Sequence, residues 1–284
     1  MSNDFSFFRL RFSFQAKERL YLAGMAANTM RGAFGYALRE TAGDEFGAIF
    51  APGASGPHPS GLADLPRPFV FRCAHLDGAT IEPGQGFWFD VNLFDTSRPL
   101  TKSFADAFRL MGRRGVGVGR GRAELRAADE EAVAVSLTPG GTPVECLFVD
   151  FLTPTELKSQ EQITPEPAFS ILFARVRDRI STLRTLYGPG PPDADFRAMG
   201  ERARAVRTTA CDIRFTDATR HSSRTGQRHP IGGFVGTARY EGLLTEFLPW
   251  LQAARYTGVG RQTTWGKGEV RVRDCLEASA FDTV

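Results

Sequence analysis

A glycine-rich run at residues 258–268 is the part of the chain whose residue types most directly suggest chemistry. Two cations stand among four glycines: Gly258, Gly260, Arg261, Gly266, Lys267 and Gly268. Glycine lets the backbone take positive φ and approach another molecule closely. Consecutive backbone N–H groups in such turns form a concavity that binds anions. The run therefore predicts a site for a phosphate-bearing partner. A tight connection between a helix and a strand is the alternative, since glycine is common in turns.

The run departs from the glycine-rich loops that bind nucleotides. Lys267 is followed by Gly268 where a P-loop has Ser or Thr, and Arg261 stands where that motif needs its first glycine. The run also leads from a predicted helix (243–254) into a predicted strand (269–273), whereas nucleotide-binding loops lead from a strand into a helix. These differences favour an RNA backbone over ATP or NAD as the partner.

Positive charge is concentrated in one segment, although the whole chain carries a net charge of only +3. Between residues 202 and 239, eight arginines stand against two aspartates, which gives +6 there and leaves −3 for the rest of the chain. A local basic stripe is typical of nucleic-acid binding; a solvated face with scattered arginines is the other interpretation. Arg220, Arg224 and Arg228 belong to this stripe.

A second glycine-rich run, 115–122, follows two arginines in the middle of the chain. Arg113, Arg114 and Arg120 are its candidate contacts with RNA phosphates. The same run can equally be a turn packed against the other half of the chain.

Histidine is the side chain best suited to proton transfer near neutral pH, and the chain has four: His58, His75, His221 and His229. His58 lies in a Gly/Pro-rich loop and His75 at the end of a predicted strand, which favours a solvated and a structural role. His221 lies between Arg220 and Arg224, so it can transfer protons while arginine holds a phosphate.

The cysteines give no sign of a metal site. Cys73, Cys146, Cys211 and Cys275 are far apart and form no CxxC pair, so a zinc site is not expected. Three of them lie in apolar strand-like runs, where cysteine is usually a small buried hydrophobe. This usage fits a reducing compartment. The N-terminal segment alternates as a strand does and resembles neither a signal peptide nor a membrane span. We therefore expect a cytoplasmic location and no membrane partner.

Each half of the chain is predicted to contain the same order of elements, β-α-β-β-α-β, which is the split βαβ pattern of a ferredoxin-like domain. In the first half, alternation at residues 8–14 predicts a strand, and helices are expected at 28–39 and 102–111. Strands are expected at 69–76, 87–94, 123–127 and 132–137. The predicted class is α+β, with tandem ferredoxin-like (RRM-like) domains at residues 1–140 and 144–284.

The second half adds one helix to this order. Strands are predicted at 144–152, 209–216, 232–240 and 269–273, and helices at 168–187, 194–206 and 243–254. A hairpin is expected at 220–230, between the second and third of these strands. In both halves a glycine-rich run follows the second helix of the repeat and precedes its last strand, which indicates an internal duplication.

This organisation resembles the RAMP superfamily of CRISPR-associated proteins, and within it the endoribonuclease that processes precursor CRISPR RNA. The resembling segments follow one another in order along most of the chain. They are residues 30–38 (MRGAFGYAL), 67–70 (RPFV), 86–94 (GFWFDVNLF), 112–117 (GRRGVG), 151–155 (FLTPT), 220–224 (RHSSR), 232–236 (GGFVG), 247–251 (FLPWL) and 257–260 (TGVG).

The resemblance implies metal-independent cleavage of RNA and no cofactor. The ribose 2′-hydroxyl attacks the adjacent phosphorus, expels a 5′-hydroxyl and leaves a 2′,3′-cyclic phosphate. The protein supplies a base, an acid and cations for the charge on the phosphorane. Related enzymes often place a histidine in or near the first helix, and residues 20–39 contain none. Tyr21 and Tyr36 are therefore further catalytic candidates in that segment, beside His221 and Arg220. Arg31 in the same segment is a candidate contact with RNA and the next catalytic candidate after them.

The expected partners are precursor CRISPR RNA, the guide RNA that results, and other subunits of a CRISPR effector complex. Two alternatives remain. One is a guide-RNA-binding subunit of the same superfamily that does not cleave RNA. The other is a nucleotide-binding ferredoxin-like domain.

Overall fold

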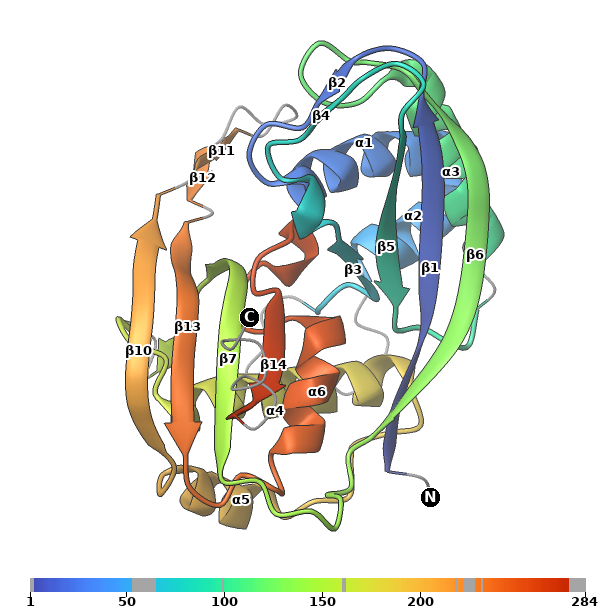
Figure 1. Cartoon of the computed structure of the whole chain (residues 1–284). Coiled ribbons are helices and arrows are strands. Elements are labelled where there is room, and N and C mark those ends of the chain that lie inside the picture. Colours follow the sequence, from blue (N-terminus) through green and yellow to red (C-terminus); the bar gives the residue numbers. More distant parts are fainter. Residues whose placement is uncertain are drawn as a thin grey trace.

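The computed structural model describes residues 3–52, 65–98, 100–159, 162–217, 219–221, 228–230 and 232–275. Two four-stranded antiparallel sheets form two units that lie side by side, each with helices on one face (Figure 1). The sheet formed by the first half of the chain and the sheet formed by the second have the same strand order. This arrangement confirms the α+β class with tandem ferredoxin-like folds.

The N-terminal sheet has the order β3-β5-β1-β6. Its strands are β1 (Asp4–Ala16), β3 (Phe69–Arg72), β5 (Gly86–Leu93) and β6 (Ala123–Ser136). Three helices cover one face, and they are α1 (Ala26–Thr41), α2 (Gly43–Phe50) and α3 (Thr101–Arg114). Phe34 of α1 and Phe108 of α3 stack with ring centroids 4.7 Å apart in the core between helices and sheet.

The C-terminal sheet has the order β10-β13-β7-β14. Its strands are β7 (Cys146–Thr155), β10 (Arg207–Thr216), β13 (Gly233–Glu241) and β14 (Val270–Asp274). Its helices are α4 (Phe169–Tyr187), α5 (Phe196–Ala203) and α6 (Leu248–Thr257). Phe173 and Phe247 lie 4.6 Å apart in the core that these helices form with the sheet.

Strand β1 contributes to both units because its two faces meet different partners. Phe12 faces the N-terminal helices, with its ring centroid 4.4 Å from that of Phe108. On the opposite face Phe7 is buried in the C-terminal core, 4.8 Å from Tyr256. Arg11 continues this second face further along the strand, where strand periodicity places every second side chain on the same side. The sequence pattern of β1 thus predicts a buried face but not that its other face joins two units.

The end of helix α6 fastens the two units together. Arg72 Nη2 of β3 and Asn92 Nδ2 of β5 each donate to the Tyr256 carbonyl at 2.9 Å, and Arg179 Nε of α4 donates to the Thr257 carbonyl at 2.8 Å. Cations and amide donors at a helix C-terminus satisfy its free carbonyls and oppose its negative end. Burial lowers the pKa of Arg179 to about 9, so the guanidinium stays charged at neutral pH.

Several element boundaries differ from the sequence predictions. Residues 123–136 form one continuous edge strand instead of two, because the acidic residues at 129–131 point into solvent and do not interrupt the pairing with β1. Helix α6 begins at Leu248 with Pro249 in its first turn, where proline is well tolerated, although we expected the helix to begin near residue 243. Helix α2 was not expected at all.

The remaining elements of the fold are short. They are β2 (Leu20–Tyr21), β4 (Thr80–Ile81), β8 (Lys158–Ser159), β9 (Gln162–Ile163), β11 (Thr219–His221), β12 (Arg228–Pro230) and the 3-10 helices η1 (Ala74–Leu76) and η2 (Thr263–Trp265). In the part of the chain that the structure describes, no helix is both long and apolar enough to span a membrane.

The cysteines differ from the prediction that three of the four are small buried side chains. Cys146, at the start of β7, forms a disulfide with Cys275, just after β14, with 5.5 Å between their Cα atoms. Cys211 is exposed on β10, and Cys73 is buried as expected. The pairing follows from the adjacency of β7 and β14 in the sheet, which brings together residues 129 positions apart.

Candidate RNA-binding cleft

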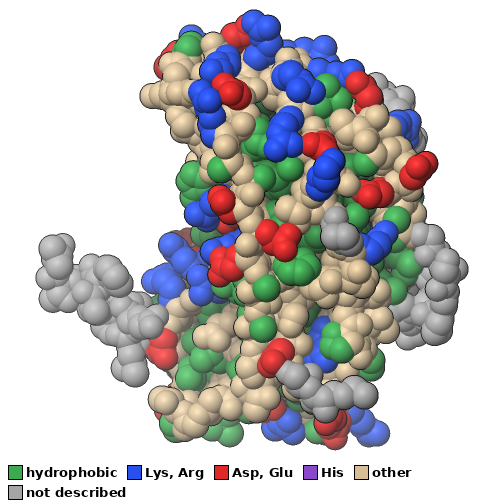
Figure 2. Space-filling model, turned by 90° about the vertical axis from the view of Figure 1, so that its right-hand side faces the viewer, with side chains coloured by type: hydrophobic (Ala, Val, Ile, Leu, Met, Phe, Trp, Pro, Cys, Tyr) green, Lys and Arg blue, Asp and Glu red, His purple; other side chains and the backbone are tan. Residues whose placement is uncertain are grey.

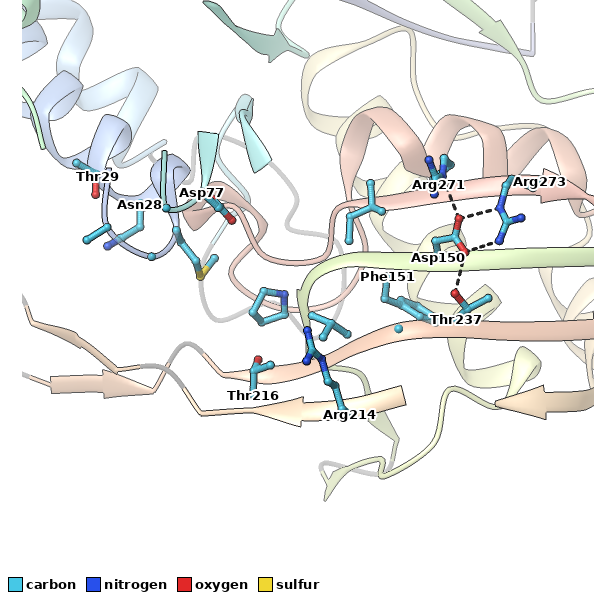
Figure 3. A pocket seen from close by; sticks show the side chains of 18 residues that line it. Asn28, Thr29, Asp77, Asp150, Phe151, Arg214, Thr216, Thr237, Arg271 and Arg273 are labelled. Carbon is cyan, nitrogen blue, oxygen red and sulfur yellow. Dashed lines mark hydrogen bonds and ion pairs between the residues drawn. The ribbon is translucent and has the colours of Figure 1, made fainter. Parts of the chain in front are cut away.

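A cleft of about 910 Å³ opens between the N-terminal end of α1 and the face of the C-terminal sheet that carries no helices. The first unit contributes Asn28, Thr29 and Asp77, and the second contributes strands β7, β10, β13 and β14 (Figure 3). Clefts between two domains are common binding sites. This cleft is therefore the candidate binding site.

A carboxylate held by two arginines forms one wall of the cleft. Asp150 accepts hydrogen bonds from Arg271 Nε at 2.9 Å, from Arg273 Nε and Nη2 at 2.9 and 2.8 Å, and from the Thr237 hydroxyl at 2.9 Å (Figure 3). Burial raises the pKa of Asp150, but these hydrogen bonds outweigh it and hold the pKa below its ordinary value. Two cations against one anion leave this wall positive, and Arg214 of β10 adds to it.

The opposite wall is the N-terminal end of α1. The Asp77 carboxylate accepts a hydrogen bond from the Ala26 N–H at 2.7 Å and so occupies a position where the helix dipole favours negative charge. Loss of water around its carboxyl raises the pKa of Asp77 to about 6, although part of the side chain stays exposed. Asp77 thus adds a full negative charge to this wall only above that pKa. None of the described residues that line the cleft is a histidine.

The C-terminal glycine-rich run lies against the protein itself. Gly258, Gly260, Gly266 and Gly268 all have φ between 70° and 90°, as their spacing predicts. A Cβ on Gly260 would lie 2.4 Å from the Glu156 carbonyl oxygen, and one on Gly268 would lie 1.9 Å from that of Val259. A Cβ on Gly266 would meet Ala27 of α1 at 2.3 Å. The close approach that glycine permits here is to neighbouring backbone and to the first helix. This geometry supports the interpretation of the run as a tight connection.

The two cations of this run share one carboxylate. Lys267 is 0 % exposed and donates to Glu156 at 3.1 Å, while Arg261, with half of its side chain exposed, donates to the other Glu156 oxygen at 2.5 Å. Burial raises the pKa of Glu156, yet the hydrogen bond from Arg261 and the charge of Lys267 hold it below its ordinary value. Burial lowers the pKa of Lys267. Lys267 therefore faces the interior, whereas Arg261 remains accessible to a ligand.

Arg31, a predicted RNA contact, is buried between the units. Its guanidinium carbon lies 5.3 Å from the ring centroid of Phe50 and 5.8 Å from that of Trp265, so α1 contacts η2 through cation–π geometry. Trp265 belongs to the glycine-rich run. The run, through Arg31 and Ala27, thus holds the first helix where it borders the cleft.

The mid-chain run forms a small turn that packs on β2. Val116 pairs with Gly121, and Val118 pairs with Tyr21. Nearby Arg113 and Arg120 are exposed, and Arg114 forms a 2.6 Å ion pair with Glu40. Figure 2 shows Lys and Arg side chains gathered at the upper end of the molecule, the end that carries β2 and β4 in Figure 1. This end of the protein presents a second basic surface.

The predicted catalytic hairpin forms at the end of β10 and β13 (Figure 1). Strands β11 and β12 pair Arg220 with His229 and His221 with Arg228. Only the backbone of these residues is described, and Arg224 lies outside the described residues. His58 does so as well. Their predicted roles stay predictions.

The alternative catalytic candidates lie elsewhere. Tyr21 is exposed in β2 and Tyr36 is exposed in α1, and neither lines the 910 Å³ cleft. No three His, Cys, Asp or Glu side chains gather as a metal would require within the described ranges.

Sequence reasoning missed most of the cleft residues. Arg271 and Arg273 lie two residues apart in a strand whose limits were predicted almost correctly. Their spacing alone therefore indicates that the two side chains lie on one face. No local sequence pattern identifies Asp150 or Asp77, because their roles depend on partners more than 50 positions away.

Comparison with known proteins finds family models that match each half of the chain. Residues 149–270 match the model of the CRISPR-associated endoribonuclease Cas6, and residues 5–139 match a model described as an N-terminal domain. A search of curated protein sequences gives no match. The Cas6 match covers most of β7, all of β10 and β13, and the whole C-terminal glycine-rich run.

Solved structures share the fold over nearly the whole chain. A Cas6 product complex aligns with a TM-score of 0.61 and 17 % identity, covering 95 % of this chain and 99 % of its own. Thermus thermophilus Cas6 aligns with a TM-score of 0.56 and 17 % identity over 95 % and 99 % of the two chains. A partial Cas6-RT-Cas1–Cas2 complex aligns with a TM-score of 0.59 and 12 % identity over 96 % of this chain and 47 % of the other.

Proposed function

We propose that this chain is a CRISPR-associated RAMP-type endoribonuclease that cleaves precursor CRISPR RNA within the repeats to give mature guide RNAs. The Cas6 match across residues 149–270 carries this proposal. The positive wall of Arg214, Arg271 and Arg273 supports it, because RNA affinity rests largely on cations that meet phosphates.

The proposed reaction needs no metal ion. The ribose 2′-hydroxyl loses its proton to a base and its oxygen attacks the adjacent phosphorus. The bond to the 5′ oxygen breaks, that oxygen takes a proton from an acid, and a 2′,3′-cyclic phosphate remains. Arginine charge near the phosphorane stabilises the transition state. His221 is the proposed base, and Arg220 is the proposed cation beside it, on the β11–β12 hairpin.

His221→Ala tests the assignment of the base. Loss of a general base typically slows a reaction by about 10²–10⁴-fold, and we expect a decrease of that size in single-turnover cleavage, with RNA affinity nearly unchanged. Cleavage within about threefold of the parent rate would remove His221 from the mechanism and turn attention to Tyr21, Tyr36 and Arg31.

A subunit that binds guide RNA without cleaving it is the second candidate. The absence of histidine from the described lining of the 910 Å³ cleft favours it. Incubation of the protein with repeat RNA in EDTA, followed by analysis of the products, separates the two. Discrete fragments with cyclic phosphate ends support the enzyme, whereas intact bound RNA supports the binding subunit.

The proposed partners are precursor and mature CRISPR RNA and other CRISPR proteins. The neighbours include a Cas6 product complex and a partial Cas6-RT-Cas1–Cas2 complex. We propose that this chain likewise keeps its product and hands it to, or remains in, a larger assembly.

A further inference from the structure

An exposed tryptophan stands on the face of the N-terminal sheet that carries no helices. Trp88 of β5 is 41 % exposed, whereas Trp250 in the C-terminal core is 1 % exposed. Aromatic side chains of this size dominate core and interface energetics, so an exposed one on a sheet indicates a binding surface. Nothing in the proposed cleavage reaction uses it.

The tryptophan is held between two other side chains. The guanidinium carbon of Arg11 lies 4.0 Å from the centroid of the Trp88 ring, and the His75 ring lies 4.4 Å from it at an angle of 32°. Asp90 fixes Arg11 through two hydrogen bonds of 2.8 and 2.9 Å. His75 Nε2 lies 3.0 Å from the Trp88 carbonyl oxygen. Trp88 and His75 thus form a pre-ordered, two-ring platform that binding would not have to assemble.

A cleft of about 280 Å³ adjoins this platform between the two units. Trp88 and His75 line it together with four arginines, Arg9, Arg72, Arg255 and Arg271, against the carboxylates of Asp90 and Glu269. The volume is just below the usual range of ligand sites, which suits part of one nucleotide and excludes a folded element. Arg271 also lines the larger cleft, so the two spaces border one another.

We propose that one unpaired base of the bound RNA strand stacks on the exposed His75 ring of the Trp88–His75 platform, which Trp88 supports from its other side, while the exposed Arg255 of the adjoining cleft meets the phosphate. Aromatic rings bind unpaired bases by stacking, and every base offers a suitable face. This inference rests on the proposed function, since it takes the RNA to be the substrate of the same protein. It assigns an unpaired nucleotide beside the repeat hairpin to the N-terminal unit.

The test compares two RNAs and three variants of the full-length protein. One RNA is a repeat hairpin with its single-stranded flank, and the other is the hairpin alone. Trp88→Ala should weaken binding of the flanked RNA about tenfold, as expected for loss of one base stack, and leave the hairpin alone unaffected. Trp88→Phe should restore most of the affinity. Phe215→Ala, which removes another exposed aromatic ring from β10, is the matched control and should change neither.

Tryptophan fluorescence gives an independent measurement. Flanked RNA should quench the parent protein, and Trp88→Phe should abolish that quenching, because the other described tryptophan side chains are buried or half-buried. AMP should quench little. If AMP quenches Trp88 and flanked RNA does not, the platform binds a free nucleotide and the RNA proposal is wrong.

The possible failures are distinguishable. Equal affinity of Trp88→Ala and the parent for flanked RNA overturns the platform while RNA cleavage by the parent still stands. Equal loss on both RNAs also overturns it, since the effect would then not depend on the flank; thermal unfolding of the variant shows whether folding is the cause. If the parent binds neither RNA, the proposed function itself fails.

Discussion

The two glycine-rich runs look alike in sequence and have different surroundings in the fold. In both, glycines with positive φ pack against neighbouring carbonyl oxygens. The run at 258–268 encloses the buried Lys267–Glu156 pair and touches the first helix through Gly266 and Trp265. The run at 115–122 lies at one end of the molecule, where Arg120 within it and the nearby Arg113 are exposed. The pattern of glycines and cations predicts the turns in both cases, but burial of the cations decides which of them can reach RNA.

Replacing one glycine by alanine in each run should give the largest difference in stability between the two runs. Gly268 and Gly119 have φ of 70° and 82°, so alanine at either position is strained by roughly 1–2 kcal/mol. Only at Gly268 would the new Cβ also collide with a carbonyl oxygen, that of Val259, while nothing lies within 4 Å at Gly119. We expect Gly268→Ala to lower the unfolding temperature far more than Gly119→Ala. Equal shifts would show that the C-terminal run is not tightly packed.

The sequence could predict the glycine conformations but not their partners. Alternation in β1 and the two repeats of β-α-β-β-α-β are local patterns, and they led to the correct fold. The carbonyls of Glu156 and Val259 and the Cβ of Ala27 meet the run only after the sheets have formed, so no local signal indicates them. The Cys146–Cys275 bridge was missed for the same reason.

Removing the buried Lys267 should cause the next largest loss of folding stability. Lys267→Ala leaves Glu156 with only the half-exposed Arg261, and breaking one side of a buried ion pair typically costs about 3–5 kcal/mol. Chemical denaturation measures the loss. Arg113→Ala is the matched control because its side chain is exposed, and it should leave stability within about 0.5 kcal/mol. A stable Lys267→Ala protein would contradict a structural role for this cation.

Acid should weaken the same contact. The pKa of Glu156 is lower in the folded protein than its ordinary value, so its contribution to stability is complete above the unfolded value and is lost as pH falls through the folded one. We expect Glu156→Gln to be less stable than the parent at neutral pH and to lose less stability on acidification. Unfolding measured from neutral pH to below the ordinary glutamate pKa checks this. Parallel curves for the two proteins would exclude the carboxylate as the source.

The exposed arginines should act on RNA binding alone. Each phosphate that a cation neutralises releases counterions and contributes roughly −0.9 to the slope of log K against log salt on a duplex. Arg113→Ala with Arg120→Ala should therefore make the slope shallower by about one to two, with the unfolding temperature unchanged. Binding titrations over a series of salt concentrations measure it. An unchanged slope would place the RNA away from this end of the molecule.

Cleavage of a repeat RNA with a single 2′-deoxy residue before the scissile phosphate tests the central claim most directly. The measurement is single-turnover cleavage in EDTA, with the all-ribose RNA as its reference. The account predicts that the all-ribose RNA is cut to a 2′,3′-cyclic phosphate and that the deoxy RNA is bound but stays intact, because its nucleophile is missing. Cleavage of the deoxy RNA, or cleavage of the all-ribose RNA only when Mg²⁺ is added, would contradict it.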